Sequence, residues 1–373
     1  MTGDDPVQVP PALALDAAAP THAPPRDGDT ATDDAPTAAG DPRVAQPLSG
    51  IVVLDLSRYL PGPLTARILA DLGARVIKIE EPRMGDPVRQ APPVRGDTSS
   101  LAALLLGGVE SLAIDLTTDL GRDALEQLMG EADVLLESFR PGTMARFGLD
   151  PAALRQRHPH LVICSISGWG QDGPTRTRAG HDLSYQAIAG TLAAGPAGAM
   201  PAVPTADVVG AWSAATSILA ALVRRAQRTE DGVVRADPPS TTVEASAAPA
   251  ADAPRGDGVW IDASLLDAAA HAAITAWAAE ADQAHAVGDP LPLTGALPGY
   301  NLYRTADDGH VALAVLEPRF WTRFCQQVER PDLIPRSFSR DPVVRDKVAR
   351  IIAGRTRSAW ATFFAAHDLP GAP

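Results

Sequence analysis

Four ionisable residues that can move protons stand at the borders of apolar segments. His181 and Asp182 precede LSYQAIAG, Asp207 precedes a long uncharged run, and Glu317 follows the apolar stretch AVL. Imidazoles and carboxylates act as general acids and bases near neutral pH, and a carboxylate can also be a nucleophile. Each residue also has a structural interpretation: a helix cap, a turn residue or a first-turn acid favoured by the helix dipole. The residues alone leave both interpretations open.

The elements that would position these residues follow a strand–helix alternation. Short apolar segments at 51–56, 74–80, 111–116, 133–139 and 161–168 predict strands, and helical stretches such as 63–73, which ends at Gly73, lie between them. This alternation is typical of a mostly parallel sheet with helices on its faces, where ligands bind beyond the carboxyl ends of the strands. We therefore predict an α/β fold with a Rossmann-like large domain.

The C-terminal region has a different pattern. From Val259 the spacing predicts a strand or turn and then one long Ala-rich helix. The segments NLYRT and HVALAVL, joined by ADDG, predict a hairpin, and Glu317-Pro318 is expected to open the next helix. A smaller α+β domain is the interpretation.

Composition sets the expected boundaries. Residues 1–46 and 229–258 are rich in Pro, Ala and Asp, and together they account for −10 of the formal net charge of −13. Segments with so few apolar residues cannot offset their ordering entropy. The expected organisation is a disordered tail at 1–46, a large domain at 47–228, a flexible acidic insertion at 229–258, a connecting helix at 259–285 and a small domain at 286–373.

Several classes of protein are disfavoured. The acidic balance speaks against general nucleic-acid binding. The two cysteines, Cys164 and Cys325, lie far apart in apolar surroundings, so we expect buried thiols, no zinc site and a reducing cytoplasm. No secretory signal is seen, and the uncharged run from Val208 to Val223 is short for a bilayer and predicts a buried helix. No membrane association is expected.

A nicotinamide cofactor is also disfavoured. The first strand–helix unit resembles a dinucleotide-binding βαβ unit, with Glu80 at the end of the second strand. Its turn, however, reads SRYLPGP in place of GxGxxG, and Pro61 and Pro63 lack the amides that would hold a pyrophosphate.

Seven segments together resemble the class III CoA-transferase family (CaiB/BaiF type), closest to its α-methylacyl-CoA racemase branch. They are LSGIVVLDLSRYLPGPLTARILADLGARVIKIEEP, DVLLESFRPGTMARFGLD, SGWGQDGP, AGHDLSYQAIAG, ADVVGAWSAATSILAAL, WIDASLLDA and YRTADDGHVALAVLEPRFW. The resemblance extends from about Leu48 to the C-terminus and is interrupted at 229–258. It implies a homodimer of interlocked rings. Family members continue past the point of Pro373, so the small domain is expected to be truncated at its C-terminus.

The resemblance implies three catalytic residues. In the racemases, the positions of His181 and Asp207 carry the two bases, and the position of Glu317 carries a glutamate that supports the histidine. In the transferases, the aspartate at the Asp207 position attacks the thioester and then carries CoA. A 2-methylacyl-CoA racemase or epimerase is the first hypothesis, a CoA-transferase is the alternative, and an inactive truncated CoA-binding homologue is the third.

The resemblance also implies a CoA site, with no cofactor beyond CoA as part of the acyl-CoA substrate and no metal. The positions expected to line CoA are Leu60, Pro61, Ile114, Asp115, Leu116, Thr117, Phe139, Arg140, Pro141, Gly142, Arg146, Ser167, Gly168 and Trp169. Some relatives hold the adenosine phosphate with an arginine directly after the second strand, where this chain has Glu81. Arg83 and Arg89 are the candidate substitutes.

Overall fold

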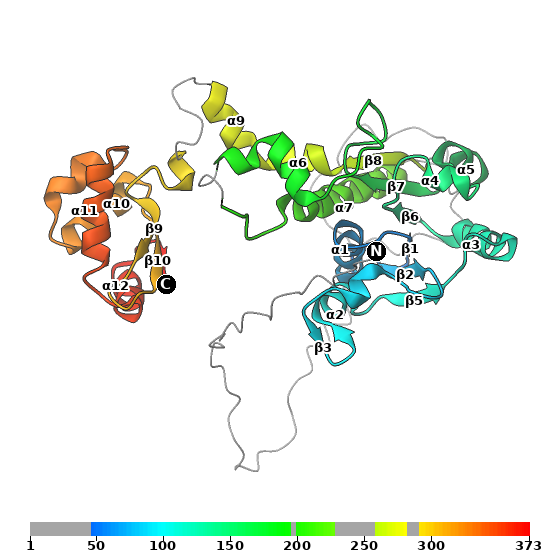
Figure 1. Cartoon of the computed structure of the whole chain (residues 1–373), viewed down its shortest axis with the longest axis horizontal. Coiled ribbons are helices and arrows are strands. Elements are labelled where there is room, and N and C mark those ends of the chain that lie inside the picture. The colour runs from blue at the N-terminus through cyan, green and yellow to red at the C-terminus, as the bar shows by residue number, and fades with distance from the viewer. Residues whose placement is uncertain (1–45, 195–198, 228–257, 282–290) are drawn as a thin grey trace, which may run out of the picture. The chain divides into compact units, whose positions relative to one another are not determined.

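A computed structural model describes residues 46–194, 199–227, 258–281 and 291–373 (Figure 1). The predicted disordered tail and acidic insertion lie outside the described residues, except for Gln46 and Gly258 at their ends. We describe the part from 46 to 281 and the part from 291 to 373 each by itself.

The first part is built on a parallel sheet of six strands. They are β1 (Val52–Asp55), β2 (Arg75–Glu80), β5 (Glu110–Ala113), β6 (Val134–Glu137), β7 (Val162–Ser167) and β8 (Trp260–Ser264), and their order in the sheet is β5-β2-β1-β6-β7-β8. The chain moves outward from β1 to β5 and then restarts on the other side of β1 with β6. This is the doubly wound order of Rossmann-like folds, and the predicted fold class is confirmed.

Helices cover both faces of this sheet, with α1 (Pro61–Asp71) and α7 (Thr205–Ala226) on one face and α3 (Asp119–Glu131) on the other. The other helices of this part are α2 (Ser100–Leu106), α4 (Thr143–Arg146), α5 (Pro151–Arg157), α6 (Asp182–Ala189), α8 (Leu265–Ala272) and α9 (Ile274–Ala281). The short elements are the 3₁₀ turns η1 (Pro87–Gln90) and η2 (Thr191–Ala194) and the hairpin strands β3 (Val94–Arg95) and β4 (Thr98–Ser99). The α1 helix ends as the sequence predicts, because Gly73 takes a positive φ of 101° just after the C-cap residue Leu72.

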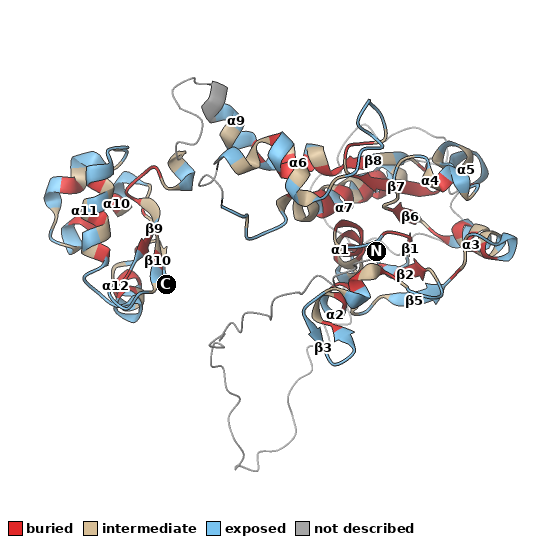
Figure 2. Ribbon diagram, viewed as in Figure 1, coloured by how far each residue is buried: buried red, intermediate tan, exposed pale blue. Residues whose placement is uncertain are grey.

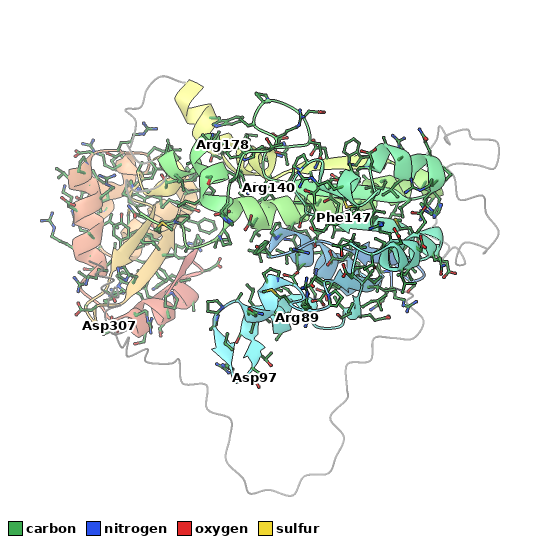
Figure 3. The ribbon with its side chains drawn as sticks, turned by 45° about the vertical axis from the view of Figure 1, so that its right-hand side comes forward. Arg89, Asp97, Arg140, Phe147, Arg178 and Asp307 are labelled. Atoms are coloured by element: carbon green, nitrogen blue, oxygen red, sulfur yellow. The ribbon has the colours of Figure 1, made fainter. Side chains whose placement is uncertain are left out.

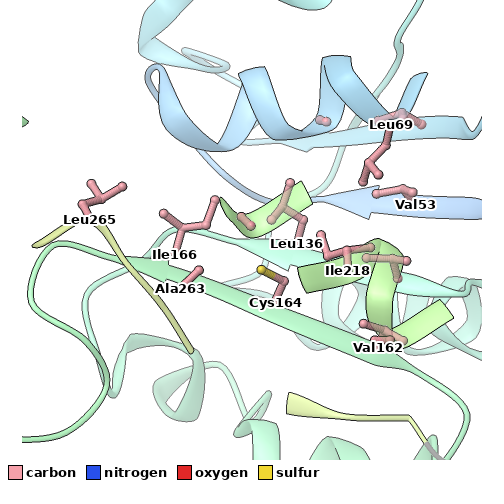
Figure 4. Close-up of a cluster of buried hydrophobic side chains, with 14 of the residues drawn as sticks. Val53, Leu69, Leu136, Val162, Cys164, Ile166, Ile218, Ala263 and Leu265 are labelled. Carbon is pink, nitrogen blue, oxygen red and sulfur yellow. The ribbon is translucent and has the colours of Figure 1, made fainter. Parts of the chain in front are cut away.

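Strand residues alternate between two apolar layers, since successive side chains of a strand point to opposite faces. Val53, Leu136 and Cys164 pack with α1 and α7 on one face (Figure 4), whereas Leu54 and Leu135 pack with α3 on the other. The central strands β6 and β7 are buried along their whole length, whereas the edge strand β5 is exposed (Figure 2). Both apolar layers make the carboxyl edge of the sheet a rigid platform.

The α7 helix covers the uncharged run that was predicted to be a buried helix. By length and composition it is apolar enough to span a membrane. Ile218 and Ala214 are fully buried, and α7 packs on α1 and α8 within the apolar layer. The α7 helix is therefore a core helix that packs against the parallel sheet.

The second part is a small α+β unit. An antiparallel sheet of order β11-β10-β9 comprises β9 (Tyr300–Arg304), β10 (His310–Ala314) and β11 (Gly371–Ala372), and its helices are α10 (Pro318–Gln327), α11 (Pro342–Ile352) and α12 (Arg357–His367). Two 3₁₀ turns, η3 (Pro292–Thr294) and η4 (Pro331–Arg336), complete it. The predicted hairpin and the helix opened by Glu317-Pro318 are confirmed.

The core of the second part is aromatic although aromatic residues are rare in the chain as a whole. Trp360 contacts Phe324, Phe363 and Phe364, with ring centroids 5.0 to 6.4 Å apart. Trp321 extends the group toward η4 by donating its indole N–H to the Leu333 carbonyl at 3.0 Å. Because the second part is small, a few large aromatic rings are sufficient to fill its core.

Two expectations for the segment after residue 258 differ from the structure. The stretch predicted as one long helix breaks at Ala273, the C-cap residue of α8, and resumes as α9. The region assigned to a connecting helix also begins with a strand, because the strand or turn predicted from Val259 is β8. This strand pairs with β7 from Trp260 to Ser264 and completes the large sheet.

Candidate active site

The largest cluster of candidate residues surrounds a cavity at the carboxyl edge of the sheet. The cavity encloses about 330 Å³. It opens where the strand order reverses between β1 and β6, since Arg58 follows β1 and Phe139 follows β6. Its walls are completed by Tyr59, Pro61, Ser138, Arg140, Pro141, Ile166, Ser167, Gly168, Trp169, Arg176, Arg178, Gly180, His181, Tyr185, Asp207 and Leu265. Doubly wound sheets bind their ligands at this point.

His181 and Asp207, which lie 26 positions apart in the chain, line the same cavity. His181 is the N-cap residue of α6, in extended conformation, and its backbone N–H donates to the Ser184 hydroxyl at 3.4 Å. Asp207 lies in the first turn of α7 and is not its N-cap residue, which is Pro204. The imidazole and the carboxylate are therefore both presented by helix starts.

Asp182 joins these two helix starts. Its Oδ1 accepts the backbone N–H groups of Ala206 at 2.8 Å and Asp207 at 3.2 Å, while its Oδ2 accepts the Gln186 amide at 2.6 Å. The N-cap residue of α7, Pro204, has no side-chain acceptor for those amides. The sequence suggested that Asp182 caps its own helix. It instead caps α7, and this contact fixes His181 relative to Asp207.

The Asp207 carboxyl is in an environment that favours its neutral form. Burial raises its pKa to about 7, and the negative charge of Asp182 contributes to this increase. A carboxyl with such a pKa can both accept and return a proton near neutral pH, which an ordinary aspartate does poorly.

Four arginines, Arg58, Arg140, Arg176 and Arg178, line the cavity. No acidic side chain within the described ranges forms an ion pair with any of them. The Arg178 guanidinium lies 5.2 Å from the centre of the Trp169 ring, and Arg58 lies 5.4 Å from the centre of Phe139. Figure 3 labels Arg140 and Arg178 in this region. The cavity therefore presents positive charge to an anionic ligand even though the chain is acidic.

A buried charge network holds the turn between β1 and α1 that forms one wall. The Lys78 ammonium, which is 1% exposed, lies 3.1 Å from Asp55 Oδ2 and 3.0 Å from Asp86 Oδ2, and donates to the Ser57 carbonyl at 2.6 Å. Asp86 Oδ1 accepts the Tyr59 backbone N–H at 3.1 Å. The positions of Arg58 and Tyr59 thus depend on a lysine inside the sheet.

Comparisons with known proteins agree with this architecture. The family model described as CoA-transferase family III matches residues 48–243 and 238–373. The chain belongs to CoA-transferase family III. It is 31% identical over 330 residues to the α-methylacyl-CoA racemase of Homo sapiens, a match that covers 86% of this chain and 76% of the relative. It is also 31% identical over 340 residues to a probable fatty acyl-CoA transferase of Mycobacterium tuberculosis, covering 87% and 82%.

The fold is similar to solved structures of the family. The crystal structure of a CAIB/BAIF family protein from Brucella suis superimposes with a TM-score of 0.69 at 25% identity, covering 88% of this chain and 84% of that one. The family resemblance noted from the seven sequence segments is confirmed.

The residues predicted to line CoA fall into three groups. Pro61, Phe139, Arg140, Pro141, Ser167, Gly168 and Trp169 line the main cavity. Ile114, Asp115, Leu116 and Thr117 line a smaller hollow of about 110 Å³, to which Arg58 and Phe139 also contribute. Gly142 lines a third hollow with Arg140 and Pro141. Because Arg58, Phe139 and Arg140 are shared, these hollows adjoin, as an extended ligand requires.

Two predicted residues lie away from these cavity walls. Leu60 is the N-cap residue of α1 and packs against the buried cluster of Val88, Ala102 and Leu105. Arg146 ends α4 and is exposed. Their assignment to the CoA site stays a prediction.

The candidate substitutes for the missing arginine are already engaged. Arg89 forms a bidentate pair with Glu80, which lowers the pKa of that carboxyl to about 2, and Arg83 donates to Glu81 at 2.9 Å. Glu80 is thus neutralised within the protein, which further disfavours the ribose-binding role of an acid at this position. Arg83 is largely exposed and keeps donors to spare.

Glu317 is the N-cap residue of α10 in the second part, and its side chain makes no cap hydrogen bond. It lines a separate apolar hollow with Leu293, Leu297, Phe338 and Arg340. The prediction that it supports the imidazole of His181 stays a prediction.

Two findings were absent from the sequence interpretation. The Ser167 hydroxyl is buried beside the main cavity without a hydrogen-bond partner in the described part of the chain. The ring of Tyr185, one helical turn after His181, forms part of the cavity wall. The segment LSYQAIAG predicted only a small apolar helix, with no role for Tyr185. Across residues 46–194, 199–227, 258–281 and 291–373, no three His, Cys, Asp or Glu side chains gather as a metal site requires.

Proposed function

We propose that this chain is an acyl-CoA enzyme that racemises or epimerises 2-methylacyl-CoA thioesters by two-base proton transfer. The observation that supports this most is the presence of His181 and Asp207 in one arginine-lined cavity, on helix starts that Asp182 joins. The similarity to α-methylacyl-CoA racemase over most of both chains points to the same reaction.

The proposed chemistry needs a base on each side of the α-carbon. One base removes the α-proton, the thioester becomes enolate-like, and the conjugate acid of the other base returns a proton to the opposite face. Asp207 suits either role because its pKa is about 7.

The test is exchange of the α-proton in deuterated water with a single enantiomer of a 2-methylacyl-CoA and no acceptor acid. We expect α-deuteration together with loss of optical purity. His181→Gln and Asp207→Asn should each slow the exchange by at least about a hundredfold, as the loss of a positioned acid or base does. Unchanged exchange in both variants would exclude the two-base assignment. The variant Glu317→Gln tests in the same assay whether that carboxylate supports the imidazole.

A CoA-transferase reaction is the second candidate, because the chain is equally similar to a probable fatty acyl-CoA transferase. Asp207 would then attack the thioester carbonyl, and its carboxyl would carry the acyl group and afterwards CoA. Borohydride or hydroxylamine added during turnover with an acceptor acid separates the two reactions. Modification of Asp207 and transfer of CoA to the acid would establish the transferase.

We also propose that the protein acts as a homodimer in the cytoplasm, with no cofactor beyond CoA. The support for the dimer is the exposed apolar side chains of Leu183, Ile188, Ile274 and Trp277 on α6 and α9. These helices adjoin, since the Trp277 indole donates to the Ala189 carbonyl at 2.8 Å. Exposed apolar side chains gathered in this way mark association surfaces.

A further inference from the structure

The phenol of Tyr185 lies in the cavity, but proton transfer by His181 and Asp207 gives it no role. Its ring is 5% exposed and packs edge-on against Trp169, with centroids 4.9 Å apart. His181 is the N-cap residue of α6, and Tyr185 lies within the helix four residues later, so one helix start presents both side chains. Both line the main cavity together with Asp207.

Two glycines make room for this phenol. A Cβ atom on Gly168 would lie 2.1 Å from the Tyr185 hydroxyl oxygen, and one on Gly180 would lie 2.9 Å from it. No real Cβ atom tolerates the first of these contacts. Gly168, from the SGWG segment, and Gly180, from the AGHD segment, therefore form a slot into which the phenol end fits.

Within residues 46–194, 199–227, 258–281 and 291–373, the hydroxyl in this slot accepts and donates no hydrogen bond. Its oxygen is not sealed from solvent, so it is accessible from the cavity that Tyr185 lines. A bound ligand atom can therefore reach it. Burial and the charge of Asp207 raise the pKa of Tyr185, against the opposing effect of Arg140, so the phenol stays protonated near neutral pH. A protonated phenol is a hydrogen-bond donor.

We propose that Tyr185 is a further catalytic residue whose hydroxyl donates a hydrogen bond to the carbonyl oxygen of the bound thioester. The role rests on the proposed acyl-CoA chemistry but not on the choice between its two reactions. Negative charge develops on that oxygen both when an α-proton leaves and when a carboxylate attacks the carbonyl carbon. A fixed donor in a cavity shielded from water stabilises such charge more than it stabilises the ground state.

The test compares two ligands on wild-type protein and on Tyr185→Phe. One ligand is a 2-methylacyl-CoA thioester, and the other is the thioether analogue, which lacks only the carbonyl oxygen. We expect Tyr185→Phe to bind the thioester about threefold to tenfold more weakly and to bind the thioether equally well. We also expect its turnover to fall by about a hundredfold, more than its affinity.

Tyr303→Phe is the matched control, because Tyr303 is a buried tyrosine of the second part whose hydroxyl donates to the Pro298 carbonyl at 2.9 Å. It should change neither ligand's affinity. If Tyr185→Phe weakens the binding of both ligands equally, the phenol only shapes the cavity. If neither binding nor turnover changes, the phenol makes no contact with the ligand. Either result overturns the proposal. A third outcome would separate the two proposals. If Tyr185→Phe weakens only the thioester, but the wild-type protein neither exchanges the α-proton nor transfers CoA, the proposed function is refuted and the hydrogen bond from Tyr185 is retained.

Discussion

At the scale of single residues, the acidity of two carboxyl groups depends on burial. The pKa of Asp207 and the pKa of Glu137 are both raised to about 7, and in each case burial is the main cause. Asp207 lines the cavity, whereas Glu137 ends β6 and accepts the Phe139 backbone N–H at 2.7 Å. Both groups bind a proton more tightly in the folded chain than in the unfolded chain. Their contribution to stability is therefore complete below pH 4 and is lost as the pH rises through about 7.

We expect Glu137→Gln to reduce this pH dependence. The neutral amide can still accept the Phe139 N–H but never becomes a buried anion. At pH 8 the variant should unfold with a free energy higher than that of the wild type by up to about 3 kcal/mol, whereas near pH 4 the two should be similar. Urea titrations at both pH values measure this. The exposed Glu131 provides the control Glu131→Gln, and a wild type that becomes more stable from pH 5 to pH 8 would contradict the expectation.

Asp182 affects catalysis through both its charge and its hydrogen bonds. The variant Asp182→Asn removes a negative charge that raises the pKa of Asp207, so the pH at which Asp207 loses its proton should decrease. The acidic limb of the pH–rate profile for α-proton exchange should move to lower pH. The rate itself should fall by about tenfold, because the amide holds the α7 amides less firmly. The control is Asp97→Asn, at an exposed residue of the β3–β4 hairpin (Figure 3). It should change neither the exchange rate nor the position of the acidic limb.

At the scale of elements, the turn from β1 to α1 is held from inside the sheet. Lys78 on β2 reaches Asp55 at the end of β1 and Asp86 before η1, and all three side chains are at most 1% exposed. Removing one member of a buried ionic network leaves the other charges without compensation. The cavity wall formed by Arg58 and Tyr59 therefore shares the stability of this network.

Replacing Lys78 by methionine should lower the free energy of unfolding by about 3 to 5 kcal/mol, because two buried carboxylates lose their counter-ion. The matched change Arg75→Met removes the exposed pair with Glu110 and should cost less than about 1 kcal/mol. Chemical denaturation of the two variants provides the comparison. Equal losses would mean that the lysine contributes no more than a surface pair.

At the scale of the whole molecule, the proposed dimer makes a prediction about α6 and α9. Ile188 is 61% exposed, and its neighbour Ala189 accepts the hydrogen bond from Trp277. Ile188→Asp should convert the dimer into a monomer in light scattering without changing the fold, because a charged group at an apolar contact remains unpaired. A wild-type protein that is already monomeric would exclude the dimer, and Val343→Asp, at an exposed valine of α11, serves as the control.

Spacing along the chain predicted β1, β2, β5, β6 and β7, the mostly parallel Rossmann-like sheet and the small α+β unit, whereas the strand order came from the structure. Period-2 and period-3.6 patterns are local, and the burial of apolar faces then selects the sheet. The resemblance of seven segments also predicted that His181 and Asp207 belong to one site.

Contacts through space decided the rest. Nothing in the order of residues showed that Asp182 caps α7 instead of its own helix, or that Lys78 inside the apolar stretch RVIKIE meets Asp86. Nor did it show that Gly168 and Gly180 form a slot for Tyr185. Each of these is a distance between residues of different elements. Such distances follow from how whole faces pack, which the spacing within a single element does not specify.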